Sequence, residues 1–245
     1  MSEMERPTAA PSALDDSEPR LQALPMRPWQ HAKASARRGG RTWQGDLAMH
    51  ELVDVTKMAL PDLRHRMVLH NHDLGPEIVA RAFPELAHAR EVARVHARED
   101  LGADVPLRTW LTLLDPARLP RLRTHDLDAL LEDEQRRTRV RDPDVLREVL
   151  ALLGLPAALV PDEPQRAWAF LAHGAGLAIV RRVLGPARLV ASVGGEVVFD
   201  PAHCAESIVH RMFRRLPDLR ELASALTPSY RFVLEALERE ERTAS

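Results

Sequence analysis

Cysteine is nearly absent from this chain: of its 245 residues, only Cys204 is a cysteine. One thiol cannot form an intramolecular disulfide, and it excludes zinc sites built on Cys-x-x-Cys pairs. We expect Cys204 to be a small buried hydrophobe. The chain also lacks an apolar run as long as the roughly 20 residues of a membrane helix. These absences predict a cytoplasmic protein that does not span a membrane.

An excess of either charge is also missing, because 34 basic residues nearly balance 36 acidic ones and the formal net charge is −2. Proteins that bind nucleic acid or an anionic membrane through a broad surface carry a clear positive excess. Such a surface is therefore not expected, although local clusters of arginine remain. Hydrophobic residues make up 45% of the chain. This is enough to bury the core of one large or two small domains, and we favour two.

Helical periodicity dominates the chain, and we predict a mainly all-α protein with two related helical-bundle domains. One β-hairpin is expected in the second domain, where β-branched residues flank Gly194-Gly195. A last amphipathic helix is expected over residues 230–239. The N-terminal segment is rich in proline, serine, alanine and acids, which predicts a disordered arm rather than a signal peptide. The predicted units are the disordered arm at 1–26, a helical site domain at 27–115, a charged connecting segment at 116–141 and a second helical domain at 142–245.

A repeated His-x-x-x-Asp spacing marks the candidate site. His50 and Asp54 are four residues apart, and so are His96 and Asp100. Residues four apart on a helix share a face, so each pair presents an imidazole and a carboxylate together. Lys57 continues the stripe of the first pair, and Gly102 suits the end of the helix that carries the second pair. Both pairs lie in the first domain, and we expect them to meet at one small cavity.

A second helix is predicted over residues 61–72, because a proline followed by an acid suits a helix start. One of its rows holds Arg66 and His70, and another holds His65 and His72. Both rows are too charged for an ordinary core face. The spacing leaves open whether His70 or His72 faces the site.

Histidines are unevenly distributed, since seven of the 11 lie between His31 and His96. Neutral imidazoles and carboxylates from facing helices can supply the ligands of one or two divalent ions. We therefore predict a metal centre for Zn, Mn, Fe or Mg, whose identity the sequence leaves open. The candidate ligands are His50, Asp54, His65, His70, His96 and Asp100.

Cations beside the predicted centre indicate an anionic substrate. A divalent ion lowers the pKa of a coordinated water, and lysine or arginine can hold a phosphate group. The predicted function is therefore metal-dependent hydrolysis of a phosphorylated small molecule or a nucleotide. The candidate catalytic cations are Lys57, Arg64 and Arg66.

Other interpretations of the same residues stay open. The polar side chains can instead form a buried network of hydrogen bonds and ion pairs, for example between Asp54 and Lys57. The protein can also be a non-catalytic module that binds nucleic acid or a protein partner through arginines such as Arg37, Arg38 and Arg41. A third interpretation is a phage-related assembly protein without turnover. The oligomeric state is not predicted.

The two halves of the chain resemble each other. Residues 75–83 match residues 176–184, and His96 falls opposite His210. Such a match predicts an internal duplication. The polar centre is missing from the second copy, where Gln165-Arg166-Ala167 stands opposite the Arg-His-Arg run of the first. We expect a degenerate second copy that stabilises the first.

Several polar motifs follow one another in the first half. They are His31-x-x-x-Ser35, Gly39-Gly40, His50-x-x-x-Asp54-x-x-Lys57, Asp62-x-Arg64-His65-Arg66-x-x-x-His70, and His96-x-x-x-Asp100-Leu-Gly102 followed by Pro106 and Trp110. Together they cover about residues 28–115, and this segment resembles a family of small proteins of unassigned function found in bacteria and their phages. The resemblance implies a shared site without naming its chemistry.

Overall fold

The computed structural model describes residues 27–227, except the side chain of Leu63. This part of the chain is mostly helical and has one two-stranded antiparallel sheet, so the prediction of a mainly all-α fold with one hairpin is confirmed. The predicted arm at 1–26 and the predicted helix at 230–239 lie outside the described residues. No helix of the described residues has the length and apolarity that crossing a membrane requires.

The first half of the described chain contains six α-helices and three short 3₁₀ helices. In chain order they are α1 (Pro28–Gly39), α2 (Trp43–Val53), η1 (Val55–Met58), η2 (Leu63–His65), α3 (Arg66–Leu69), α4 (Leu74–Ala82), α5 (Ala89–Leu101), α6 (Leu107–Thr112) and η3 (Pro116–Arg118).

The second half contains seven α-helices and the hairpin. Cys204 is buried there, as expected. The elements are α7 (Leu127–Thr138), α8 (Pro143–Leu153), α9 (Leu155–Leu159), α10 (Pro164–Ala169), α11 (Gly174–Leu184), β1 (Arg188–Ser192), β2 (Gly195–Phe199), α12 (Pro201–Phe213) and α13 (Leu219–Ala225).

Short polar and glycine signals set the ends of the helices. Gly40 and Gly102 end α1 and α5 in the left-handed conformation, with φ of 63° and 76°. Glycine adopts this conformation without a steric cost, and the predicted helix end at Gly102 is confirmed. Asp126 and Asp142 begin α7 and α8, because their carboxylates accept hydrogen bonds from backbone N–H groups of the first turn.

The second predicted helix is shorter than expected. It consists of the turn η2 and the single turn α3, and it ends at His70, where φ is −88° and ψ is 66°. Asn71 explains this break. Its Oδ1 accepts hydrogen bonds from the backbone N–H of Leu74 at 2.6 Å and of Gly75 at 3.2 Å, and so it starts α4.

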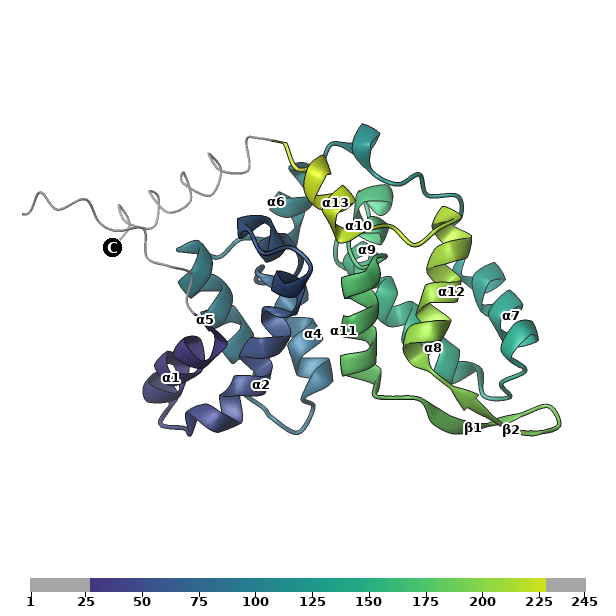
Figure 1. Cartoon of the computed structure of the whole chain (residues 1–245), viewed down its shortest axis with the longest axis horizontal. Helices are drawn as coiled ribbons and strands as arrows, with labels where there is room; N and C mark the ends of the chain where they lie inside the picture. Colours follow the sequence, from purple (N-terminus) through teal and green to yellow (C-terminus); the bar gives the residue numbers. More distant parts are fainter. Residues whose placement is uncertain (1–26, 228–245) are drawn as a thin grey trace, which may run out of the picture.

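The helices of the two halves pack in matching pairs. In the first half, α1 packs on α2 and α5, and α4 packs on the same two helices. In the second half, α7 packs on α8 and α12, and α11 packs on the same two helices. The two halves meet where α4 and α11 lie side by side near the centre of the molecule (Figure 1).

Two further contacts between the halves are reciprocal. η1 of the first half packs on α11, and α9 of the second half packs on α4. The segments that follow α6 and α13 form an antiparallel bridge. In it, Asp115 N–H donates to Ala225 O and Thr227 N–H donates to Leu113 O, each at 2.8 Å. One continuous apolar core therefore runs through both halves.

The charged segment at 116–141 includes a helix that packs on the second half. Its charged run forms α7, which buries Leu130 and Glu134 (4% and 1% exposed). Arg211 on α12 forms an ion pair with Glu134. Most charged side chains of α7 are exposed, and the opposite side of the helix packs on the second half.

The predicted hairpin forms around Gly194 and Gly195. Arg188 lies opposite Phe199 in the antiparallel register, and Ser192 lies opposite Gly195. The two glycines have φ of 109° and 140°, which other residues rarely adopt. The hairpin connects α11 to α12, whereas a short turn connects α4 to α5 in the first half.

Candidate metal centre

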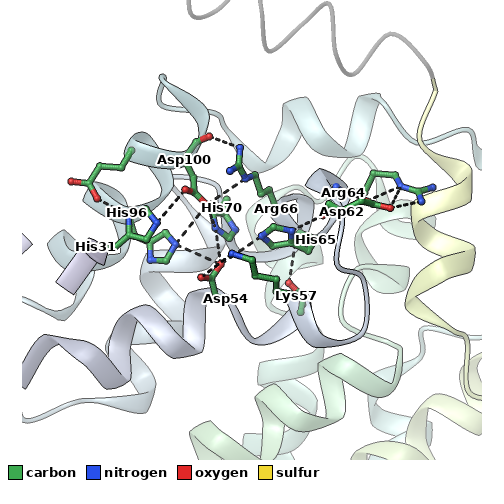
Figure 2. Close-up of polar contacts among 12 residues, drawn as sticks. His31, Asp54, Lys57, Asp62, Arg64, His65, Arg66, His70, His96 and Asp100 are labelled. Atoms are coloured by element: carbon green, nitrogen blue, oxygen red, sulfur yellow. Dashed lines mark hydrogen bonds and ion pairs between the residues drawn. The ribbon is translucent and has the colours of Figure 1, made fainter. Parts of the chain in front are cut away.

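Buried ionisable side chains meet inside the first half, where α1, the end of α2, the η2–α3 segment and α5 come together (Figure 2). Their exposed fractions do not exceed 5%. They come from positions as far apart in the chain as 31 and 100. We call this group the His/Asp cluster, and it consists of His31, Asp54, His65, His70, His96 and Asp100.

Hydrogen bonds to the backbone hold the η2–α3 segment in place. Thr56 Oγ1 donates to the carbonyl of His65 at 2.9 Å, and Trp110 Nε1 donates to the carbonyl of His70 at 3.2 Å. These bonds tie the segment to η1 and to α6. They explain why two imidazoles of a short, irregular segment reach the cluster.

The carboxylate of Asp54 faces three imidazoles. Its Oδ1 lies 3.5 Å from His65 Nε2, 3.5 Å from His70 Nε2 and 3.7 Å from His96 Nε2. Burial acts to raise the pKa of Asp54, but these imidazoles bring the pKa well below its ordinary value. Asp54 is therefore ionised at neutral pH.

Asp100 faces the imidazoles from the other side. Its Oδ2 lies 3.1 Å from His70 Nε2 and 3.8 Å from His96 Nε2, and its Oδ1 lies 3.2 Å from His31 Nε2. Burial acts to raise the pKa of Asp100, while contacts with His31 and His70 lower it below the ordinary value. The acids of the two His-x-x-x-Asp pairs therefore meet at the same imidazoles.

Most of the inward-facing atoms of the cluster have no hydrogen-bond partner among the described residues. They are Nε2 of His31, His65, His70 and His96, both oxygens of Asp54 and Oδ2 of Asp100. Buried polar groups are almost always paired, and each exception costs about 1–3 kcal/mol. Lone pairs of nitrogen and oxygen that converge in this way can be satisfied together by a cation.

The spacing of these atoms fits a divalent cation. One ligand atom each from Asp54, His70, His96 and Asp100 lies within 4.8 Å of the others. Metal–ligand bonds of about 2.1 Å place neighbouring ligand atoms of one ion roughly 3.0–3.4 Å apart. The N···O distances from His70 and His96 to the acids, between 3.1 and 3.8 Å, are close to that range. Imidazoles combined with carboxylates suit Zn, Mn or Fe.

His50, a predicted ligand, lies behind His96 rather than beside the acids. Its Nδ1 is 2.8 Å from His96 Nδ1, and its Nε2 is 3.1 Å from Ser35 Oγ. Ser35 Oγ is in turn 3.0 Å from Asp46 Oδ2, which also accepts a hydrogen bond from Arg41. His50 and His96 are therefore in contact, and a row of hydrogen bonds leads from His96 toward Arg41.

This row of hydrogen bonds fixes the position of each proton. The Asp46 carboxylate can only accept, so Ser35 donates to it and accepts from Nε2–H of His50. His50 Nδ1 is then an acceptor, and Nδ1 of His96 carries the hydrogen. His96 Nε2 is left with a lone pair that faces both acids, as a metal ligand requires.

Burial keeps these two imidazoles neutral. Burial and the neighbouring His31 lower the pKa of His50 to about 4. Burial lowers the pKa of His96 to about 3, although Asp54 acts in the opposite direction. The neutral imidazole is the form that binds a metal ion.

His65 and His31 are oriented in the same way as His96. Nδ1 of His65 is 2.6 Å from the carbonyl oxygen of Asp62, which can only accept. Nδ1 of His31 is 2.7 Å from Oε2 of Glu99. Each imidazole therefore holds its hydrogen on Nδ1 and turns Nε2 toward the acids.

The prediction of ligands from sequence missed His31, together with Ser35 and Asp46, which support His50. All three are at most 3% exposed. His31 and Ser35 share a face of the otherwise basic α1, and they form the first motif of the family resemblance. The spacing of this histidine and serine, four residues apart on one helix face, was the sequence signal that could have identified them as part of the site.

Two of the predicted cations lie at the edge of the cluster. Lys57 Nζ is 3.6 Å from Asp54 Oδ2, and Arg66 Nε is 3.3 Å from Asp100 Oδ2. Their side chains are 27% and 13% exposed. These two cations therefore separate the buried acids from solvent.

Arg64 and His72 lie outside the cluster. Arg64 forms an ion pair with Asp62 at 2.6 Å, and the close-up view places it on the far side of His65 from the acids (Figure 2). His72 pairs with Asp73 at 3.0 Å, and its side chain is 37% exposed. His70 is fully buried in the cluster. Of the two histidines that the spacing left open, His70 is therefore the one that faces the site.

Residues 26–119 match the model of a family described as a domain of unknown function (DUF6915). The matched segment contains α1 to α6 and every residue of the His/Asp cluster. It agrees with the predicted resemblance to a family of unassigned function. Neither the curated proteins nor the solved structures contain a match. The comparisons therefore locate the domain that holds the cluster and assign it no activity.

Proposed function

We propose that the protein is a metal-dependent hydrolase of phosphoesters and that the His/Asp cluster holds the ion. The observation that carries this proposal is the convergence of Asp54, His70, His96 and Asp100 on one buried point. A divalent ion bound there supplies a Lewis acid and a water of lowered pKa.

The chemistry of the side chains supports this role. The two carboxylates match the two positive charges of the ion, and His70 and His96 bind as neutral donors. His50 orients His96 through their hydrogen bond. His65 is a further ligand on the Asp54 side, because its Nε2 lies 3.5 Å from Asp54 Oδ1.

Lys57 and Arg66 support an anionic substrate. Both contact the cluster acids and both are partly exposed. A phosphoester that approaches from this side meets an ammonium and a guanidinium group, which bind phosphate oxygens. We leave Arg64 out of the substrate site because its guanidinium pairs with Asp62.

The proposal is tested with purified full-length protein. We expect elemental analysis to find about one divalent ion per chain or more, and we expect hydrolysis of phosphomonoesters or nucleotides in Mn²⁺, Mg²⁺ or Zn²⁺ that a chelator abolishes. Asp54→Asn, which keeps the size and removes the charge, should weaken metal binding and activity by about 100-fold or more. The control Asp62→Asn, on an exposed acid paired with Arg64, should keep both properties.

Two results would contradict the proposal. One is a protein that binds no divalent ion, and the other is a metal-loaded protein that hydrolyses none of these substrates. Metal-free protein that binds nucleic acid with a steep salt dependence would instead favour the binding-module alternative.

We also propose that the second half is a degenerate copy of the first and that its role is structural. The matching helix pairs support this proposal. The helix ends support it too, because Arg139 and Arg214 end α7 and α12 in the left-handed conformation that Gly40 and Gly102 adopt in α1 and α5. On this basis α7 belongs to the second unit.

When α7, α8 and α12 are aligned with α1, α2 and α5 on their C-terminal ends, largely apolar residues take the place of the polar site. The alignment from sequence placed His210 opposite His96. The alignment on helix ends shifts α12 by two residues, so that Ile208 lies opposite His96. The large side chains that take the place of site residues are at most 5% exposed. The replacements are Leu130 for His31, Leu150 for His50, Gly154 for Asp54, Ile208 for His96 and Met212 for Asp100.

A further inference from the structure

The carboxylate of Asp100 faces two different groups with its two oxygens. Oδ2 lies toward His70 and His96, at 3.1 and 3.8 Å from their Nε2 atoms. Oδ1 lies on the other side, 3.2 Å from Nε2 of His31. A carboxylate with one oxygen on each side can bridge two metal ions of a two-metal site.

The surroundings of His31 are those of a metal-binding histidine, and His31 is not among the four residues that converge on the first ion. Its side chain is fully buried, and its Nε2 has no hydrogen-bond partner among the described residues. Glu99 holds Nδ1 at 2.7 Å and also pairs with Arg38. A carboxylate on Nδ1 is the typical partner of a metal-binding histidine.

The two outer imidazoles of the cluster pair with different acids. His65 is paired only with Asp54 among the two acids, and His31 is paired only with Asp100, in the part of the chain that the structure describes. The two imidazoles therefore stand at opposite ends of the cluster.

We propose that the site holds two divalent cations and that the second lies between His31 Nε2 and Asp100 Oδ1, with Asp100 as the bridge. This inference rests on the proposed function. Two protein ligands leave the remaining positions of this second ion to water or to phosphate oxygens of the substrate. Cations of the Mn²⁺ and Fe²⁺ type accept such a mixed set of imidazole, carboxylate and water ligands.

The experiment titrates metal-stripped full-length protein with Mn²⁺. Calorimetry gives the number of ions bound, and electron paramagnetic resonance detects coupling between two neighbouring Mn²⁺ ions. We expect two ions and a coupled signal in the unmodified chain. His31→Gln should bind one ion and show the signal of isolated Mn²⁺, whereas the control His125→Gln, on an exposed side chain, should behave like the unmodified chain.

A second variant protects the test against a failure of His31→Gln to fold. Glu99→Gln keeps a hydrogen-bond acceptor for His31 but removes the negative charge. It should weaken the second Mn²⁺ by about 10- to 100-fold and leave the first unchanged.

The outcomes separate this inference from the proposed function. One ion in the unmodified chain, or two ions retained in His31→Gln, would overturn the second site and leave the first intact. No Mn²⁺ at all would overturn both proposals.

Discussion

A histidine side chain has two ring nitrogens, and the partner of one decides what the other can do. In the cluster, Nδ1 of His31, His65 and His96 is held by a carboxylate, a carbonyl and another imidazole respectively. Three unlike partners thus produce the same inward-facing Nε2. The chemistry of the site depends on these outer contacts as much as on the ligands themselves.

His173 is the same kind of residue in a purely structural place. Its Nδ1 accepts from Gly176 N–H at 3.1 Å, and its Nε2–H donates to Phe170 O at 2.9 Å. Burial lowers the pKa of His173 to about 4 from 6.5. Because the unfolded chain takes up the proton first, stability is complete above pH 6.5 and falls as the pH drops toward 4.

We expect His173→Asn to remove this part of the pH dependence. Asn71 makes equivalent hydrogen bonds at the start of α4, so asparagine can keep the cap. In urea unfolding at about pH 7 and about pH 4.5, the variant should lose roughly 2–3 kcal/mol less stability than the unmodified chain. His125→Asn, an exposed control, should change nothing. An equal loss in His173→Asn and the unmodified chain would contradict the prediction.

At the scale of elements, the packing of α4 on the end of α3 depends on a glycine. A Cβ atom on Gly75 would lie 2.0 Å from the carbonyl oxygen of Leu69. In the second half, a Cβ on Gly176 would lie 1.8 Å from the carbonyl oxygen of Leu171. Both clashes are with backbone, so neither can be relieved by a side-chain rotation.

Gly75→Ala should therefore lower the free energy of unfolding by about 2–4 kcal/mol. Because Leu69 directly precedes His70, we also expect weaker metal binding. Thermal unfolding and metal titration measure the two effects. Gly45→Ala is the matched control, since its Cβ meets only Thr42 Oγ1 at 3.5 Å. Equal melting temperatures for the two variants would show that α4 can move away from α3.

The elements that the sequence predicts correctly are those with strong local signals. The hairpin follows from Gly194-Gly195, and the end of α5 follows from Gly102. The split of the segment 61–72 depends on the side-chain cap made by Asn71, which hydrophobic periodicity does not reveal. Spacing also could not place His31 beside Glu99, because these residues are 68 positions apart.

At the scale of the whole molecule, each half covers a helix of the other. α4 and α11 pack together, while η1 reaches α11 and α9 reaches α4. The first half therefore owes part of its stability to a surface that the second half provides. The apolar centre proposed for the second half suits that role, because it needs no ligand to stay folded.

We expect residues 1–122 alone to be less stable than the full chain. Without α9 and α11, the apolar side of α4 is exposed to water, which favours aggregation. Separate fragments 1–122 and 123–245, produced together, should co-purify as a complex that binds Mn²⁺. Size-exclusion chromatography with metal analysis checks this. A monomeric 1–122 fragment that melts at the temperature of the full chain would contradict the prediction.

The reciprocal packing of α4 and α11 also sets an order of events during protein synthesis. The ribosome releases the first half before α11 exists, so α4 has no α11 to pack on at that time. The second half, with leucine, isoleucine and methionine at its centre, can collapse as soon as it emerges. The docking of α4 on α11 is therefore completed late, after α11 has left the ribosome.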